Sequence, residues 1–377
     1  MMCFITICFL VTLMPNMPQS RVHQSIKMFH PNPFDLEAAD LEAIIVDFND
    51  TIPGDTLFIN RSEEGYPLSC FRKITAGVCI DNECRILRIN LYWTMTGRYL
   101  GFELPVGEFL SKTEHVEFND KEYKKMHTLL SDPYSLLVNF SMDELAPEKN
   151  VETDAVSSAT ISDVLAFTVE GAVYTTYTMW HLVYGDTRRK IIKMTEQELT
   201  IGLLEIILKS SDVEDRVWGL NHIWGYVKPT DKLYDLIFEN IQNDNIYLAE
   251  KAIEVIPPEA SSAASIQLRL LNCFNSANNE LKRLILNKLQ DASTLHGKTI
   301  ENLASGIYEY NDPVITDILA LFAKHSVSEP NALQNMAGLL QHENRFIARK
   351  AYLYLEGIDI QNSKIKQQMN LYQSVHK

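Results

Sequence analysis

Apolar and polar residues alternate along residues 87–104 with the period of two that is typical of half-buried β-strands. The apolar positions of the first predicted strand are Leu87, Ile89, Leu91 and Trp93. Thr96-Gly97 has the composition of a turn, and the alternation resumes on a returning strand at Leu100, Phe102 and Leu104. The pattern therefore predicts an antiparallel β-hairpin.

Two helices are predicted around this hairpin. Residues from Phe34 to about Asp50 have the spacing of a short helix, with apolar side chains at Leu36, Leu41, Ile44 and Ile45. A second helix is predicted to begin at Asn119, whose side chain can cap it while Glu122 reaches back to the cap. Its apolar face is Tyr123, Met126, Leu129 and Leu130. Strands and helices together predict an α+β domain with an antiparallel sheet.

From about Thr195 onward the pattern is helical throughout, interrupted by short polar breaks. Polar starts spaced by 31 to 35 residues precede apolar helices at Ser211-Asp212, Asn243-Asp244, Asn278-Asn279, Asn311-Asp312 and His342-Glu343. This is a period of paired helices, and the region resembles a degenerate HEAT-like solenoid. Such arrays usually bind a partner on an extended surface. The alternative is a helical domain that only supports the first domain.

The chain divides accordingly into residues 1–20, 21–190 and 191–377, with a junction at Gly185-Asp186 and the basic run that follows it. Met1 to Met14 carries no charge, but its apolar run is about half of the roughly 20 residues that a membrane span needs. We therefore predict a signal peptide in residues 1–20, with a cut near Ser20. An uncleaved signal would leave the chain associated with a membrane. A mis-assigned start or a buried apolar strand are the alternatives.

The 377 residues carry a formal net charge of −15. This charge argues against a nucleic-acid partner, because no basic surplus is present to neutralise phosphates. Gly-rich phosphate loops, His-Glu-x-x-His and Gly-x-Ser-x-Gly are absent from the sequence. We also find no constellation of acids and bases that identifies a catalytic site.

Three cysteines cluster in the first domain, at Cys70, Cys79 and Cys84. Cys79 and Cys84 flank a plausible hairpin loop, so a cross-strand disulfide is geometrically reasonable in an exported protein. A zinc site is the alternative, although the spacings match no familiar zinc motif. Cys273 lies in an apolar helical pattern and is predicted to be a small core residue.

The stretch from Asp154 to Thr160 packs a carboxylate, three hydroxyls and small side chains before a long apolar segment. Thr160 and Asp163 have the spacing of a capping box, which predicts a helix that begins at Thr160. The face of that helix would carry Leu165, Val169, Ala172, Thr176 and Trp180. A helix amino terminus favours a phosphate. The alternative is that the hydroxyls only cap the helix.

Asp154, Ser157, Ser158, Ala159 and Thr160 resemble the flavinylation motif of the FMN-binding domain family. This family includes the FMN subunits of sodium-pumping NADH:quinone oxidoreductase and of Rnf complexes. The resemblance implies that an extracytoplasmic FMN transferase joins FMN to Thr160 through a phosphoester. Ser158 departs from the family, in which Gly is common at that position. The resemblance covers roughly residues 65–185 and is concentrated in the motif.

The resemblance implies an exported, periplasmic or membrane-associated flavoprotein that relays electrons to or from a partner protein. Residues 21–190 would form the FMN-binding-like domain, and the helical repeats would dock the redox partner. Aromatic candidates for stacking on the flavin are Trp93, Tyr99, Tyr177 and Trp180, although an aromatic residue at strand or helix spacing is more often part of the core. His115 is a candidate hydrogen-bond donor or a solvated loop residue. The alternative function is a cofactor-free helical-repeat scaffold.

Overall fold

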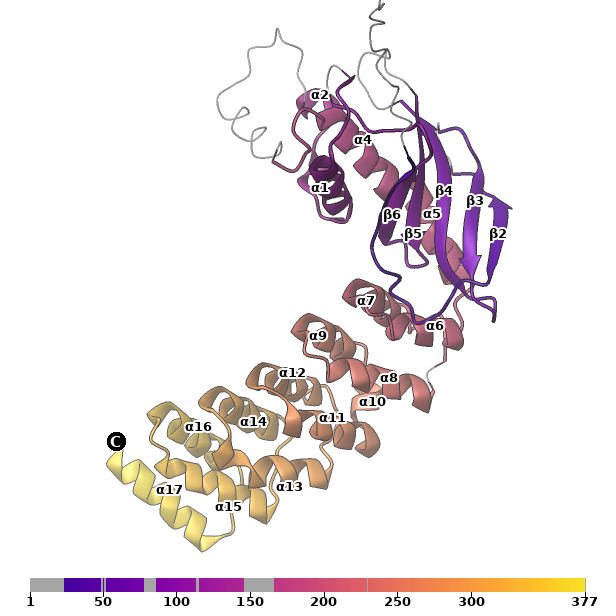
Figure 1. Ribbon diagram of the computed structural model, residues 1–377. Coiled ribbons are helices and arrows are strands. Elements are labelled where there is room, and N and C mark those ends of the chain that lie inside the picture. Colours follow the sequence, from indigo (N-terminus) through magenta and orange to yellow (C-terminus); the bar gives the residue numbers. More distant parts are fainter. Residues whose placement is uncertain are drawn as a thin grey trace, which may run out of the picture. The chain divides into compact units, whose positions relative to one another are not determined.

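The computed structural model describes residues 24–48, 50, 52–77, 86–112, 115–145, 166–228 and 230–376 (Figure 1). The chain forms two compact units. The first unit contains the residues up to Lys190 except Asn32–Asp40 and Arg61–Leu68, and these two segments belong to the second unit together with Ile191–Lys377. The signal peptide predicted in residues 1–20 lies outside the described residues.

The first unit is built on a six-stranded sheet with the strand order β1-β6-β5-β4-β3-β2 (Figure 1). Antiparallel pairs join β1 to β6, β6 to β5 and β5 to β4. The strands are β1 (Ile26–Phe29), β2 (Asp40–Ile45), β3 (Thr56–Arg61), β4 (Pro67–Ala76), β5 (Leu87–Thr94) and β6 (Tyr99–Leu104). The predicted β5–β6 hairpin is confirmed, and its turn contains Gly97 with a φ of +80°.

The helix predicted between Phe34 and Asp50 is wrong. These residues contain the edge strand β2, which is flanked by hydrogen bonds from Ala39 N to Arg61 O and from Val46 N to Asp55 O. Apolar residues at Leu41, Ile44 and Ile45 fit a short helix and a short strand equally well. Pairing with β3, which lies next to β2 in the sheet, decides between them because it satisfies backbone groups that local sequence cannot.

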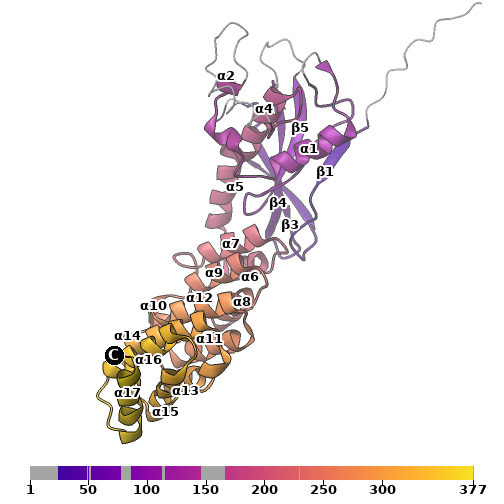
Figure 2. The same cartoon turned by 90° about the vertical axis from the view of Figure 1, so that its left-hand side faces the viewer.

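One face of the sheet carries helices. They are α1 (Asp120–Leu130), α4 (Val173–Tyr184) and α5 (Asp186–Gln197), while the 3-10 turn η2 (Leu136–Asn139) and α2 (Met142–Leu145) pack on α4 (Figure 2). The predicted cap of α1 is confirmed, since the Asn119 side chain accepts the Glu122 N–H and Glu122 accepts the Asn119 N–H. Trp93 of β5 donates its indole N–H to Val183 O of α4 over 2.9 Å. The core of this unit therefore lies between the sheet and these helices.

The opposite face of the sheet carries a row of aromatic rings. Phe58 stacks on Phe71 with ring centroids 4.6 Å apart, and Phe71 stacks on Tyr92 at 4.9 Å. Phe29 of β1 meets Tyr92 edge-on at 4.8 Å, although β6 runs between their strands. Gly101 of β6 lies opposite both residues in the register, so the missing side chain lets the two rings meet.

The second unit is an array of helix pairs (Figure 1). Its helices are α6 (Ile201–Leu208), α7 (Val213–Asn221), α8 (Asp231–Ile241), α9 (Ile246–Glu254), α10 (Pro258–Ser261), α11 (Ala264–Ser276), α12 (Asn279–Leu289), α13 (Gly297–Ser305), α14 (Asp312–Lys324), α15 (Pro330–Gly338), α16 (Arg345–Glu356) and α17 (Ser363–Val375), with 3-10 turns η3 (Ile307–Glu309) and η4 (Leu339–Gln341). Helices α7, α9, α12, α14 and α16 pack in one layer. Helices α6, α8, α11, α13, α15 and α17 pack in the other.

The caps of the array recur at an interval of 33 residues. In the first layer the N-cap residues are Asp212, Asn245, Asn278, Asn311 and Asn344, and each side chain accepts a backbone N–H of the helix that follows. In the second layer they are Thr230, Ala263, His296, Glu329 and Asn362. The interval is shorter than the roughly 40 to 47 residues of HEAT repeats. The pairs share one continuous core, which includes the buried Cys273, as predicted.

Candidate functional site

The motif from Asp154 to Thr160 lies outside the described residues, but the structure defines both ends of the segment that carries it. On the amino-terminal side α2 packs on α4 and ends at the buried Leu145. On the carboxy-terminal side the buried Val169 donates its N–H to Thr176 Oγ1 of α4 over 3.1 Å. Both ends of the motif-bearing segment are therefore fixed on the same helix.

The helix predicted to run from Thr160 to Trp180 is wrong over residues 166–172. These residues form turns, and Gly171 has a φ of +71°, a conformation that favours glycine over other residues. Helix α4 begins at Val173, and its N-cap residue, Ala172, makes no side-chain capping bond. The helix start and the phosphate environment predicted at Thr160 lie outside the described residues.

A hollow of about 420 Å³ is lined by Lys112, Val116, Glu122, Glu170 and Gly171, the last two of which follow the motif-bearing segment in the sequence. Lys112 Nζ contacts Glu122 Oε1 at 2.7 Å. The Lys112 ammonium and the Asn119 backbone N–H hold the pKa of the Glu122 carboxyl below its usual value.

Helix α4 is hydrogen-bonded to the residue that precedes Lys112, because Thr175 donates its hydroxyl to Ser111 O over 3.0 Å. Among the described residues that line the hollow, Lys112 carries the positive charge, and it is already paired with the Glu122 carboxylate.

Most of the aromatic candidates are core residues. Trp93 and Tyr99 are buried, and Tyr99 contacts His127 Nδ1 through its hydroxyl at 2.9 Å. Trp180 is buried and donates its indole N–H to Asp132 O. Tyr177 is half-buried on α4, with its ring 4.0 Å from that of His181. Of these four residues, Tyr177 alone is partly accessible to solvent. His115, the candidate hydrogen-bond donor, is exposed and has a φ of +59°.

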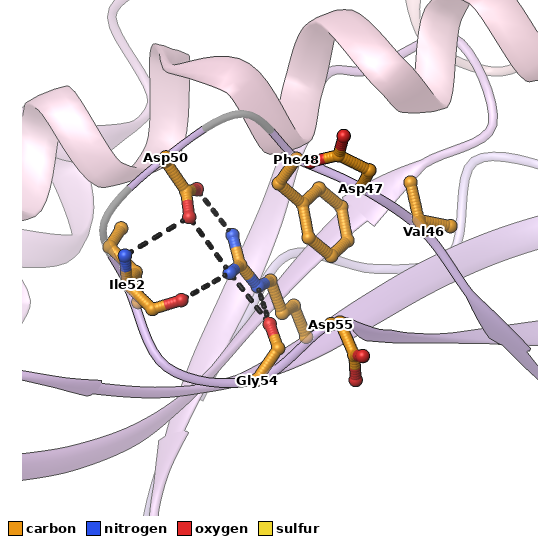
Figure 3. A pocket seen from close by; sticks show the side chains of 8 residues that line it. Val46, Asp47, Phe48, Asp50, Ile52, Gly54 and Asp55 are labelled. Carbon is orange, nitrogen blue, oxygen red and sulfur yellow. Dashed lines mark hydrogen bonds and ion pairs between the residues drawn. The ribbon is translucent and has the colours of Figure 1, made fainter.

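A buried arginine organises the second hollow of the first unit, a space of about 330 Å³ beside the β2–β3 connection (Figure 3). Arg72 is 1% exposed, and its guanidinium contacts the Asp50 carboxylate at 2.6 Å. It also donates to Ile52 O and Gly54 O, and it lies 3.8 Å from the centre of the Phe48 ring. Every side-chain nitrogen is engaged, so this arginine holds the connection in place and is not available to an anionic ligand.

Arg72 was not predicted as a structural centre from the sequence. The available signal was its position in β4, two residues from the buried Cys70 and two from the buried Ile74, which places its side chain on the same, core-facing side of the strand. The disulfide predicted between Cys79 and Cys84 lies outside the described residues.

Two histidines meet between β1 and α1. The rings of His30 and His127 stack with centroids 4.2 Å apart. Ser131 donates its hydroxyl to His127 O and contacts His30 Nε2 at 2.6 Å. Because the serine proton is directed to a carbonyl, His30 Nε2 is the donor of the second bond, and Ser131 is not an activated nucleophile. Burial, with a smaller contribution from His30, lowers the pKa of His127 to about 4.

Within the parts of the chain that the structure describes, no helix combines the length and the apolar character that crossing a membrane requires. No protein-family model, no curated protein and no solved structure matches this chain.

Proposed function

We propose that this protein is an exported flavoprotein that carries FMN on Thr160 as a phosphoester and relays electrons to or from a protein docked on its helical repeats. The observation that carries the proposal is the motif itself, in which Asp154, Ser157, Ala159 and Thr160 stand in the order that flavinylation uses. The competing interpretation was that the hydroxyls cap the following helix. The N-cap residue of α4 is Ala172, so the motif does not supply the cap of that helix.

The surroundings of the segment also support the proposal. A modifying enzyme needs a hydroxyl on a segment that it can reach, while the carrier domain must hold that segment at a defined place. Leu145 and Val169 are buried at the two ends, which fixes the points where the segment leaves and rejoins the domain. Two features involve residues that follow the motif-bearing segment in the sequence, namely the hollow lined in part by Gly171 and the partly accessible Tyr177 ring. Both are candidates for contact with the isoalloxazine.

The chemistry of the cofactor determines what the flavin and the protein each contribute. Bound flavin supplies one- and two-electron transfer, and the protein supplies position and polarity. No residue set in the described chain forms an acid–base constellation around a substrate cavity, so a carrier fits better than an enzyme with a substrate of its own. A carrier needs a docking surface for its partner, and a helical array is suited to that task.

The test is expression with an export signal in a host that contains an FMN transferase, followed by denaturing gel electrophoresis under ultraviolet light. We expect a fluorescent band for the natural protein and for Thr160→Ser, which keeps the hydroxyl. We expect no band for Thr160→Ala or in a host without the transferase. A dark band for the natural protein in the transferase host would refute the flavin proposal.

A second candidate function is a cofactor-free scaffold, and the regular array favours it. The interval of 33 residues between caps is kept through α16 and α17, and a regular array of this kind is sufficient to bind a partner without any cofactor. A protein that remains free of flavin in the transferase host but binds a partner through residues 191–376 would establish this alternative.

A further inference from the structure

The last described repeat, α16 with α17, differs in charge from the rest of the molecule. The chain as a whole has a formal net charge of −15, yet residues 344–376 contain Arg345, Arg349, Lys350, Lys364 and Lys366 against only Glu356 and Asp359. The side chains of all five cations are exposed. None of them forms an ion pair with any residue that the structure describes. A basic surface is therefore present on an acidic protein.

The positions of two arginines show which way this surface faces. Arg283 stands five residues after the cap Asn278, and its Nε donates to Asp317 Oδ2 of the next repeat over 2.6 Å. Arg349 stands at the same position after the cap Asn344. The first residue after a cap also contacts the following repeat. Asp312 follows the cap Asn311, and its carboxylate accepts a hydrogen bond from Nδ2 of Asn344, the cap of the next repeat, over 2.6 Å. Arg345 holds that position in the last repeat. Both arginines thus occupy places from which earlier repeats bind their neighbour.

The same face is not built to receive another apolar helix pair. In the preceding repeat Leu333 and Leu340 are buried. The residues 33 positions later are Lys366 and Gln373, and both are exposed. Exposed apolar side chains are also present, namely Leu371 and Val375 on α17 and, on α16, Phe346, which is 56% exposed, and Leu353, which is 51% exposed. The spacing of Phe346 and Leu353 along α16 places them beside the two arginines.

We propose that this face, which we call the basic end face and define as Arg345, Phe346, Arg349, Leu353 and Lys366, binds an acidic segment of a partner protein. Carboxylates of that segment take the place that Asp317 holds against Arg283, and its apolar side chains cover Phe346 and Leu353. Arginine suits this role because its planar fork matches a carboxylate in a bidentate manner. The inference extends the docking part of the proposed function, and it does not depend on flavin.

The experiment uses the full chain and a fluorescein-labelled polyglutamate peptide, with binding followed by fluorescence anisotropy at increasing salt. We expect salt-sensitive binding despite the negative charge of the protein. The double variant Arg345→Glu/Arg349→Glu should weaken it by about tenfold or more, which corresponds to at least ~1.4 kcal/mol. Lys298→Glu/Lys324→Glu is the matched control, because it changes the net charge equally on exposed residues of α13 and α14. That control should retain the natural affinity.

Equal weakening in both double variants would overturn the proposal, since it would mean that only net charge matters. Self-association of the full chain that is lost in Arg345→Glu/Arg349→Glu would also overturn it, in favour of a second copy as the occupant. Circular dichroism of both variants checks that the helices are intact. Because the flavin band on a gel is independent of this binding, failure here is distinguishable from failure of the flavin proposal.

Discussion

Arg72 and Thr187 lie far apart in the sequence, yet Arg72 Nη1 donates to Thr187 Oγ1 over 2.9 Å. The bond joins the central strand β4 to the first turn of α5. The same guanidinium binds the Asp50 carboxylate, so one side chain connects the β2–β3 connection, the sheet and α5. The first unit depends on this contact, because a buried cation must have all of its partners in place.

We predict that Arg72→Met destabilises the first unit by about 3–5 kcal/mol, because the Asp50 carboxylate and two carbonyl groups lose their partner. Chemical denaturation followed by tryptophan fluorescence measures the change. Arg88→Met is the matched control, since Arg88 is an exposed arginine on the neighbouring strand β5. A loss for Arg72→Met no larger than the control would show that the network contributes little to stability.

Each capping asparagine of the array should contribute to the free energy of unfolding by about the same amount as the other capping asparagines. Asn278→Ala removes the acceptor of the Leu281 N–H and should lower the free energy of unfolding by about 1 kcal/mol. Asn278→Asp should cost much less, because a carboxylate accepts the same bond and suits a helix amino terminus. Urea denaturation of the two variants checks this. Equal losses would exclude capping as the reason for the asparagine at this position.

The depressed pKa of His127 makes the first unit sensitive to acid. The folded state keeps this imidazole neutral down to a pKa of about 4, whereas the unfolded chain takes up the proton near the ordinary value of 6.5. The unfolded state therefore binds more protons between these values, and the free energy of unfolding falls as the pH is lowered through this window. The loss attributable to His127 is at most about 1.4 kcal/mol per pH unit.

His127→Gln provides the comparison for that pH dependence. Glutamine does not titrate, and its amide can still meet the Tyr99 hydroxyl, which contacts His127 in the natural protein. Thermal melts between pH 4 and pH 6.5 should therefore show a shallower dependence for the variant. Parallel curves for the two proteins would assign the acid sensitivity to other groups.

Gly101 should tolerate no side chain. A Cβ at this position would lie 2.3 Å from Met28 O and 2.6 Å from the Phe29 ring, so β1 would have to move away from β6. We expect Gly101→Val to expose the β1 amides to hydrogen exchange while β4 and β5 remain protected. Unchanged protection of residues 26–29 would contradict the close approach of β1 and β6.

The features predicted correctly from the sequence are those with local causes. The β5–β6 alternation and the Asn119–Glu122 cap depend on neighbours a few residues away. Edge strand β2 and the Arg72 network depend on partners distant in the sequence, which local patterns do not reveal.

The sequence predicted the repeats of the array but not the exact residue that caps each helix. Two of the predicted helix starts were Asn243-Asp244 and His342-Glu343, whereas the capping side chains belong to Asn245 and Asn344. Neighbouring polar residues are equally good candidates until the backbone shows which one accepts the helix N–H. With the observed caps the interval becomes a regular 33 residues.

Local sequence patterns also failed to predict part of the candidate site. The position of α4 was mispredicted because apolar spacing continues through Val169 and Ala172, while Gly171 between them takes a left-handed conformation that ends the pattern. The proposed attachment at Thr160 follows from a resemblance in the sequence.

The intact mass of the exported protein tests the central claim most directly. After co-expression with an FMN transferase, the account predicts a mass increase of one FMN less one water for the natural chain, and no increase for Thr160→Ala. An unshifted natural chain, or a shift that persists in Thr160→Ala, would contradict the assignment of covalent FMN to Thr160.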